Sequence, residues 1–163
     1  MTATITLPPD EPVILIDRTF DAPRELVFKC FTDPVHIVHF WGPHGSTTPV
    51  CKIDLRVGGR WHYVMAFPDG NRYPVTSAYL EISPPERVVY RDAPGNYDGN
   101  LESLAPPFMV TTILFEDLGG GKTRVHSFVV LNSIADRDHQ VERGFAHTVS
   151  QGLERLAGYL KTI

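Results

Sequence analysis

The last thirty residues of the chain carry an apolar stripe that constrains the fold more than any other feature. Apolar side chains recur there every three or four positions, with polar side chains between them. The stripe consists of Val141, Phe145, Val149, Leu153, Leu156 and Leu160. This spacing is typical of an α-helix with one buried face. Ser133 and Asp136 resemble a capping box, so the helix is predicted to begin at Ile134 and to run to about Lys161, on the order of 40 Å at 1.5 Å per residue.

The rest of the chain is predicted to supply an apolar partner for that helix in the form of a sheet. Runs rich in β-branched and aromatic residues predict seven strands. They cover residues 13–20, 50–55, 60–67, 73–82, 87–92, 108–116 and 123–131. Their hairpin-like connections favour an antiparallel arrangement. We therefore expect a single domain with an α+β fold, in which a curved antiparallel sheet wraps around a long C-terminal helix.

Two short helices are predicted between the first and second strands. Pro23 lies in the first turn of one helix, and Asp33-Pro34 ends that helix and opens the other. Val35, Val38 and Trp41 are expected to face inward from the second helix. The order of elements along the chain is then β-αα-β6-α.

Two segments outside these elements carry separate predictions. Residues 1–12 are polar and rich in proline, and we expect them to form a loose lead-in. Residues 93–107 form a connection that is long for a compact domain. This connection is either a surface excursion or a lid that places Tyr97, Leu101 and Leu104 over a cavity.

Composition and charge narrow the classes of function. The net charge of -4 and the pI near 5.9, without a run of Lys or Arg, argue against nucleic acid or an anionic membrane as a partner. No apolar stretch is long enough for a membrane span, and no signal peptide is expected. Cys30 and Cys51 form no CxxC pair, so free thiols and a cytoplasmic location are expected, although one disulfide is chemically feasible.

Several short motifs are spread over nearly the whole chain. They include Phe20-Asp21-Ala22-Pro23-Arg24-Glu25-Leu26-Val27-Phe28, Phe31-Thr32-Asp33-Pro34, Trp41-Gly42-Pro43, Val57-Gly58-Gly59-Arg60-Trp61, Pro84-Pro85-Glu86-Arg87-Val88-Val89-Tyr90 and Leu153-Glu154-Arg155-Leu156-Ala157-Gly158-Tyr159-Leu160. In this combination the chain resembles the bacterial family related to the activator of the heat-shock protein 90 ATPase. That family lies within the START and birch-pollen-allergen (helix-grip, SRPBCC) superfamily. The resemblance implies a hydrophobic-ligand cavity between the sheet and the long helix, and no common catalytic residues.

The chain departs from that family at two places. Many relatives carry a glycine followed by an aromatic residue in the middle of the last helix, where this chain has Thr148-Val149. The loss of a large ring there is expected to enlarge or reshape the floor of the cavity. The loop of residues 93–107 is also longer than is usual in the family, so the resemblance does not define the mouth of the cavity.

The candidate lining residues are mostly aromatic. Trp61, Tyr63 and Met65 share one face of the strand 60–67 and form its larger and more apolar set, so we place them inward. The other candidates are Trp41, Tyr90, Phe108, Phe128, Phe145, Val149 and Leu153. The alternative is that these side chains fill a solid core. The strands 73–82 and 123–131 do not alternate cleanly, which leaves their inward faces undecided.

Polar candidates are few, and none forms a catalytic signature. Tyr63, Tyr79, Tyr90, Thr112 and His126 would orient a ligand if they faced inward, or would otherwise bond to backbone or water. His36, His39 and His44 have ligand-like spacing, but no cysteine and no HExxH glutamate completes a metal motif, and His139 and His147 lie too far apart on the last helix for one ion. The seven histidines are therefore interpreted as surface residues, and neither a metal nor a cofactor is expected. No nucleophile motif or phosphate-binding glycine loop is found.

Three functions remain open on these grounds. The leading hypothesis is a non-enzymatic protein that binds a small hydrophobic or amphipathic ligand between its sheet and its last helix. The second is a cyclase- or aromatase-like enzyme using the same cavity, which would require an inward pair of ionisable groups with shifted pKa values. The third is a chaperone-associated interaction module, and a homodimer is compatible with any of them.

Overall fold

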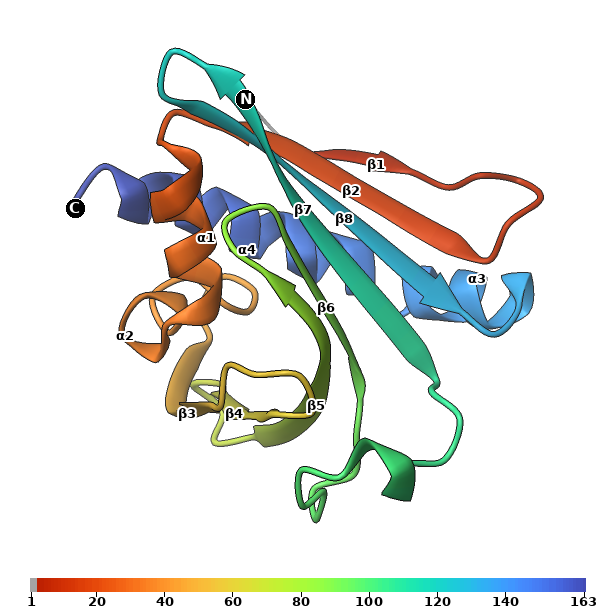
Figure 1. Ribbon diagram of the computed structural model, residues 1–163. Helices are drawn as coiled ribbons and strands as arrows, with labels where there is room; N and C mark the ends of the chain where they lie inside the picture. Colours follow the sequence, from red (N-terminus) through yellow and green to blue (C-terminus); the bar gives the residue numbers. More distant parts are fainter. Residues whose placement is uncertain (1–2) are drawn as a thin grey trace.

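In the computed structural model, which describes residues 3–163, one antiparallel sheet of eight strands curves around a group of helices (Figure 1). The elements are β1 (Thr4–Thr6), β2 (Val13–Phe20), α1 (Arg24–Thr32), α2 (Pro34–Ile37), β3 (Thr47–Ile53), β4 (Arg60–Ala66), β5 (Arg72–Ser83), β6 (Arg87–Asp92), η1 (Leu101–Ser103), β7 (Met109–Gly119), β8 (Lys122–Leu131), α3 (Ile134–Glu142) and α4 (Phe145–Leu160). The strand order in the sheet is β1-β2-β8-β7-β6-β5-β4-β3. The predicted helix-grip, α+β architecture is confirmed.

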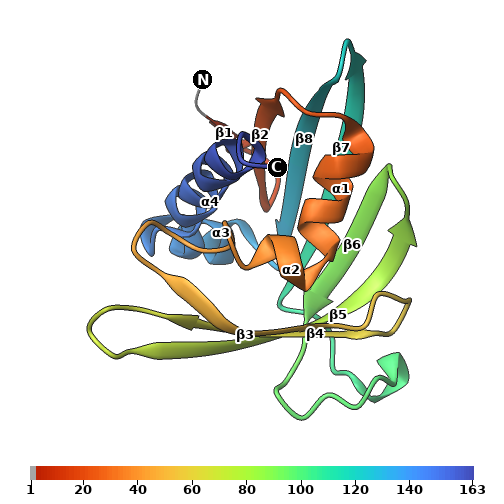
Figure 2. The same ribbon diagram turned by 90° about the vertical axis from the view of Figure 1, so that its left-hand side faces the viewer.

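The sheet bends sharply, and the helices lie in the angle of the bend. In Figure 2, strands β3 to β5 run across the lower part of the molecule while β6 to β8 rise from it, and α1, α2 and α4 lie on the inner side of both parts. Helix α1 contacts β7 and β8, and α4 contacts β2. The inner face of the sheet and these helices therefore enclose the apolar interior of the domain.

The C-terminal helix is not continuous, so the prediction of one helix from residue 134 to 161 is wrong in this respect. Gly144 takes a φ of 89°, in the left-handed region, and separates α3 from α4. A residue with a Cβ rarely adopts that conformation, whereas glycine does so without strain. Ser133 caps α3 through a hydrogen bond that its side chain accepts from the amide of Asp136, as the capping pattern predicted.

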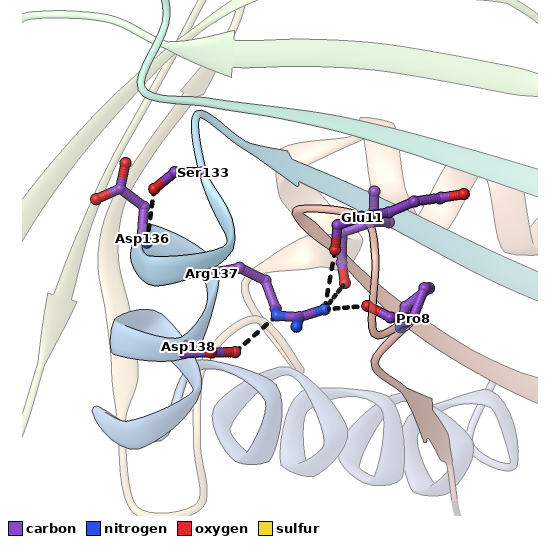
Figure 3. Close-up of polar contacts among 7 residues, drawn as sticks. Pro8, Glu11, Ser133, Asp136, Arg137 and Asp138 are labelled. Carbon is purple, nitrogen blue, oxygen red and sulfur yellow. Dashed lines mark hydrogen bonds and ion pairs between the residues drawn. The ribbon is translucent and has the colours of Figure 1, made fainter.

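Part of the expected loose lead-in is an edge strand. Strand β1 pairs antiparallel with β2. Arg137 of α3 holds the connection between these strands, because its Nη1 donates to the carbonyl oxygens of Pro8, Glu11 and Val13 at 2.8, 3.0 and 3.1 Å (Figure 3). The Arg137 side chain is almost fully buried, and its Nε donates to the carboxylate of Asp138. One guanidinium thus bonds to three backbone carbonyls, two in the connection between β1 and β2 and one at the first residue of β2.

The second short helix faces the core with a different residue from those expected. Val35 is 68% exposed, whereas Ile37 is buried. Asp33 caps this helix by accepting a hydrogen bond from the amide of Val35, which fixes Val35 in the first turn on the outer side. Val38 and Trp41 are partly buried against the core, as predicted.

The loop of residues 93–107 packs against the outer face of the sheet rather than over its interior. Its backbone is tied to β4 and β5, since Arg60 donates to the carbonyl of Gly95 and the amide of Ala93 donates to the carbonyl of Thr76. The Tyr97 hydroxyl donates to the carbonyl of Gly58 at 2.6 Å. In Figure 2 this loop lies on the opposite side of β3 to β5 from the helices. The surface-excursion interpretation is therefore the correct one, and the lid interpretation is not.

Candidate functional site: a cavity between the sheet and α4

A cavity of about 220 Å³ lies between the inner face of the sheet and helices α1 and α4. Its wall draws on five neighbouring strands, from β4 to β8, on the helices and on the segment after α2. The lining residues are Phe31, Phe40, Trp41, Gly42, Trp61, Tyr63, Met65, Val75, Ser77, Tyr90, Met109, Thr111, Ile113, Ser127, Val129, Phe145, Thr148, Val149, Gly152 and Leu153. The interior is thus not packed solid, although most of its surface is apolar.

Most of the side chains predicted to line a cavity surround this one. They are Trp41, Trp61, Tyr63, Met65, Tyr90, Phe145, Val149 and Leu153. Phe108 and Phe128 do not line it, which corrects their expected inward placement. Phe108 is 42% exposed at the end of the loop before β7, and Phe128 stacks on His126 on the outer face of β8.

Strand β8 explains why the sequence misplaced Phe128. Along this strand Thr123, Val125, Ser127 and Val129 are buried, so its odd-numbered residues face the interior. The inner set therefore includes two hydroxyl side chains, while the outer set includes Phe128. Hydrophobicity alone does not distinguish these faces, and the pairing of β8 with β2 and β7 decides between them.

One wall of the cavity is built from interlocking aromatic rings. The ring centroid of Trp61 lies 5.0 Å from the ring centroid of Trp41, 5.2 Å from that of Tyr63 and 5.1 Å from that of Tyr90. The contacts with Trp41 and Tyr90 are edge-to-face, which is a favoured geometry for aromatic pairs. Alternation along β4 places Trp61 and Tyr63 on the same face, and the chain after α2 brings Trp41 against them. These contacts fix the rings in position before any ligand enters.

The opposite wall is held close by a clamp that sequence reasoning did not identify. Arg155 of α4 donates from Nη1 to the carbonyl oxygens of Gly42 and Pro43 and to Oγ of Ser46, and from Nη2 to the Ser46 carbonyl. Gly152, one turn earlier, lets the helix approach the same segment, because a Cβ there would lie 3.2 Å from the Phe40 carbonyl oxygen. Arg155 lies within the 153–160 motif noted in the sequence, but the groups to which it donates lie more than a hundred residues earlier in the chain. The motif alone therefore did not indicate this contact.

A strip of hydroxyl groups crosses the sheet side of the cavity. It consists of Ser77 on β5, Tyr90 on β6, Thr111 on β7 and Ser127 on β8. Among these only Tyr90 was singled out from the sequence. Alternate residues of a strand share one face, so Ser77, Thr111 and Ser127 could have been grouped with the inward residues of their strands. That grouping requires knowing which face of each strand is the inner one.

The cavity contains no charged side chain among its lining residues. Its titratable groups are phenols that burial keeps neutral. Burial raises the pKa of Tyr63 from 10.0 to about 12, an effect that the Trp41 indole partly opposes. Burial and the neighbouring Tyr63 raise the pKa of Tyr90, while hydrogen bonding with Thr111 lowers it in part. The site is therefore neutral at physiological pH and offers hydrogen-bonding groups without a formal charge.

These shifts predict that the protein loses stability in alkaline solution. The folded state binds the Tyr63 proton more tightly than the unfolded state does. The protonated phenol therefore contributes fully to the free energy of unfolding below about pH 10, and this contribution is lost as the pH rises through about 12. The loss amounts to about 3 kcal/mol for two pKa units. Urea unfolding measured at several values between pH 9 and pH 12 should show a smaller decline for Tyr63→Phe than for the wild type. Tyr73 is exposed, so the stability of Tyr73→Phe should fall with pH as that of the wild type does. The same pH dependence of stability in all three proteins would show that Tyr63 is not the group responsible.

The other polar candidates do not form a second site. His126 donates from Nε2 to the carboxylate of Glu116 at 3.0 Å on the outside of the sheet, and Thr112 shares that outer face. Tyr79 is buried next to Trp61 but does not line the cavity. No group of three potential metal ligands gathers within residues 3–163.

Both thiols are free, and neither is activated. Burial raises the pKa of Cys30 to about 11, and burial raises that of Cys51 although the Trp61 indole N–H opposes it. A raised pKa keeps a thiol protonated and weakly nucleophilic at neutral pH. Within the same described part of the chain, no helix is long and apolar enough to cross a membrane.

Comparisons with known proteins agree with this fold. The profile of the family described as activator of Hsp90 ATPase homolog 1-like protein matches residues 21–161. A solved structure from Nitrosomonas europaea is 26% identical, with a TM-score of 0.81 over 92% of this chain and 94% of that chain. A protein from Mycobacterium smegmatis is 22% identical, with a TM-score of 0.83 over 98% of both chains. The AHSA1 protein from Silicibacter pomeroyi is 20% identical, with a TM-score of 0.68 over 92% of this chain and 98% of that chain. No curated protein matches.

Proposed function

This chain belongs to the activator of Hsp90 ATPase homolog 1-like family, and we propose that it is a binding protein for a small apolar molecule. The observation that carries the proposal is the cavity of about 220 Å³ with its aromatic and aliphatic lining. Burial of apolar ligand surface would supply most of the binding free energy, because the lining offers few polar contacts. The preformed aromatic wall lowers the cost of ordering side chains on binding.

The volume limits the size of the ligand. An engineered apolar cavity of about 150 Å³ binds benzene, and pockets for drug-sized ligands begin at about 300 Å³. A cavity of about 220 Å³ lies between these values and suits a molecule of one or two rings. Long acyl chains, sterols and extended polyketide chains exceed a volume of about 220 Å³.

The same geometry gives little support to the enzymatic alternative. A cyclase- or aromatase-like reaction needs a group that exchanges protons near neutral pH. The lining contains no carboxylate, histidine or lysine, and the phenols of Tyr63 and Tyr90 have raised pKa values. The chaperone-associated alternative is supported by the family description alone, and co-purification with the chaperone is the observation that would favour it.

The proposal is tested by titrating the protein with 2-methylnaphthalene, a neutral two-ring hydrocarbon. The chain has two tryptophans, and both line the cavity, so the two indole N–H signals in a nitrogen–proton NMR spectrum report on occupancy directly. A bicyclic ring buries on the order of 250 Å², or ~6 kcal/mol before ordering costs, which predicts a dissociation constant of roughly 0.1 to 1 mM. Both indole signals are expected to shift and saturate together.

A result in which neither indole signal responds to 2-methylnaphthalene or to its hydroxylated counterpart would reject the cavity as a ligand site. Shifts confined to residues on the outer face, such as Phe108 and Phe128, would instead indicate nonspecific adsorption to exposed apolar surface.

A further inference from the structure

The walls of the cavity differ in polarity, and this asymmetry constrains the chemistry of a ligand. On the helix side the lining is largely hydrocarbon, with Phe145, Val149 and Leu153 of α4 and with Thr148 as the exception. On the sheet side the four hydroxyls of the strip lie on four consecutive strands. A molecule filling the space would therefore meet apolar surface on one side and hydrogen-bonding groups on the other.

The hydroxyls of the strip are deeply placed and incompletely partnered. Ser77, Thr111 and Ser127 are 6%, 5% and 6% exposed. Thr111 lies opposite Tyr90 in the pairing of β6 with β7. The side chains of Ser77 and Ser127 form no hydrogen bond with another residue of the described chain, 3–163. Within residues 3–163, the cavity-lining group that is buried without a hydrogen-bond partner is the indole N–H of Trp61, and no hydroxyl of the strip is in that state. The hydroxyls line the cavity, so an occupant that supplies an acceptor or a donor gains affinity by bonding to them.

The surroundings of the strip exclude formal charge on that occupant. No lining residue carries a charge that could pair with a carboxylate or an ammonium group. An ionised group brought into this space would lose its hydration without a counter-charge, which is far more costly than burying a neutral hydroxyl or carbonyl. The cavity therefore discriminates by charge as well as by size.

We propose that the cavity selects a neutral one- or two-ring molecule that carries a hydroxyl or carbonyl group on one edge, directed at the hydroxyl strip of Ser77, Tyr90, Thr111 and Ser127. This inference rests on the proposed binding function and adds the polarity and the charge of the ligand to it. The ring system lies against the aromatic wall and α4, and the oxygen lies against the sheet. Ordered water filling the strip is the competing arrangement, and it would remove the advantage of a polar ligand.

Three probes of nearly the same shape separate these possibilities at pH 7: 2-naphthol, 2-methylnaphthalene and 2-naphthoate. Their dissociation constants are measured by calorimetry and by the indole signals of Trp41 and Trp61. We expect 2-naphthol to bind about three- to tenfold more tightly than 2-methylnaphthalene, because one additional hydrogen bond increases affinity by about this factor. We expect 2-naphthoate to bind at least about tenfold more weakly than 2-naphthol, because its carboxylate is ionised at this pH.

A matched pair of variants assigns the preference to the strip. Thr111→Val combined with Ser127→Ala removes two inward hydroxyls with little change of shape. In this double variant, 2-naphthol and 2-methylnaphthalene should bind with nearly equal dissociation constants. Thr112→Val, at the next position of β7, faces the outer surface and should keep the wild-type ratio. Circular dichroism and the thermal midpoint verify that each variant is folded.

The outcomes distinguish this inference from the proposed function itself. Equal affinities of 2-naphthol and 2-methylnaphthalene for the wild type would overturn the inference and leave the binding function standing. Strong binding of 2-naphthoate would overturn the exclusion of charge. Failure of all three probes to move the indole signals would reject both. The wild-type comparison needs no variant, so a folding defect in the double variant does not prevent the decision.

Discussion

Val149→Trp is expected to abolish the binding of 2-methylnaphthalene. Val149 lines the cavity from the second turn of α4, opposite the aromatic wall. An indole at this position would occupy much of a space of about 220 Å³, so the ligand and the new side chain would compete for one volume. The loss should exceed about a hundredfold in dissociation constant, because a clash with a packed ring is not relieved by small movements. Calorimetry and the indole signals of Trp41 and Trp61 provide the measurement.

The control for this variant is His147→Trp on the same helix. His147 is exposed, so the same ring is added without entering the cavity, and probe binding should remain at the wild-type level. Urea unfolding of Val149→Trp should give a free energy close to or above that of the wild type, since a void is being filled. If the tryptophan variant does not fold, Val149→Phe is the smaller replacement. Undiminished binding to a folded Val149→Trp would show that the probe occupies another site.

Gly59→Ala is expected to destabilise the fold by about 4 kcal/mol or more, at the upper end of what single substitutions produce. A Cβ at Gly59 would lie 1.9 Å from the carbonyl oxygen of Asp54 and 2.8 Å from that of Arg56. Both obstacles are backbone atoms, which cannot rotate away as a side chain can. The residue also accepts a hydrogen bond from the amide of Tyr79, so a shift would disturb the start of β4 and its pairing with β5.

Gly95→Ala provides the comparison. Gly95 lies in the outer loop, its φ is outside the left-handed region, and a Cβ there meets no atom within 4 Å. This substitution should change the free energy of unfolding by less than about 1 kcal/mol, and loss of backbone freedom in the unfolded chain favours a small gain. Chemical denaturation of both variants tests the pair. A Gly59→Ala protein as stable as Gly95→Ala would mean that the turn before β4 relaxes far more readily than its geometry implies.

The parts of the fold that could be predicted from sequence are those that depend on local periodicity. The pattern of β4 places Trp61, Tyr63 and Met65 on one face because alternate residues of a strand point the same way. The capping pair Ser133 and Asp136 defines the start of α3 because the hydrogen bond spans only three residues. In both cases the interacting groups lie within a few residues of one another.

The positions that were mispredicted depend on contacts between distant segments. The inward position of Ser127 and the outward position of Phe128 follow from the register of β8 against β2 and β7, not from the hydrophobicity of these residues. Strand β1 exists because β2 offers an unpaired edge and because Arg137 anchors the intervening turn. Neither partner can be recognised from the short segment alone.

Side-chain spacing along a regular backbone was sufficient to predict strands β2 to β8, the two short helices, the apolar face of α4 and the aromatic set of β4. Strand β1 and the break at Gly144 did not follow from it. The position of the long loop outside the sheet and the four hydroxyls on the inner face depend on how distant segments pack together. The void beside α4 depends on the same packing. These features arise where strands from different parts of the chain meet in a particular register, and the volume left between them depends on every side chain that surrounds it.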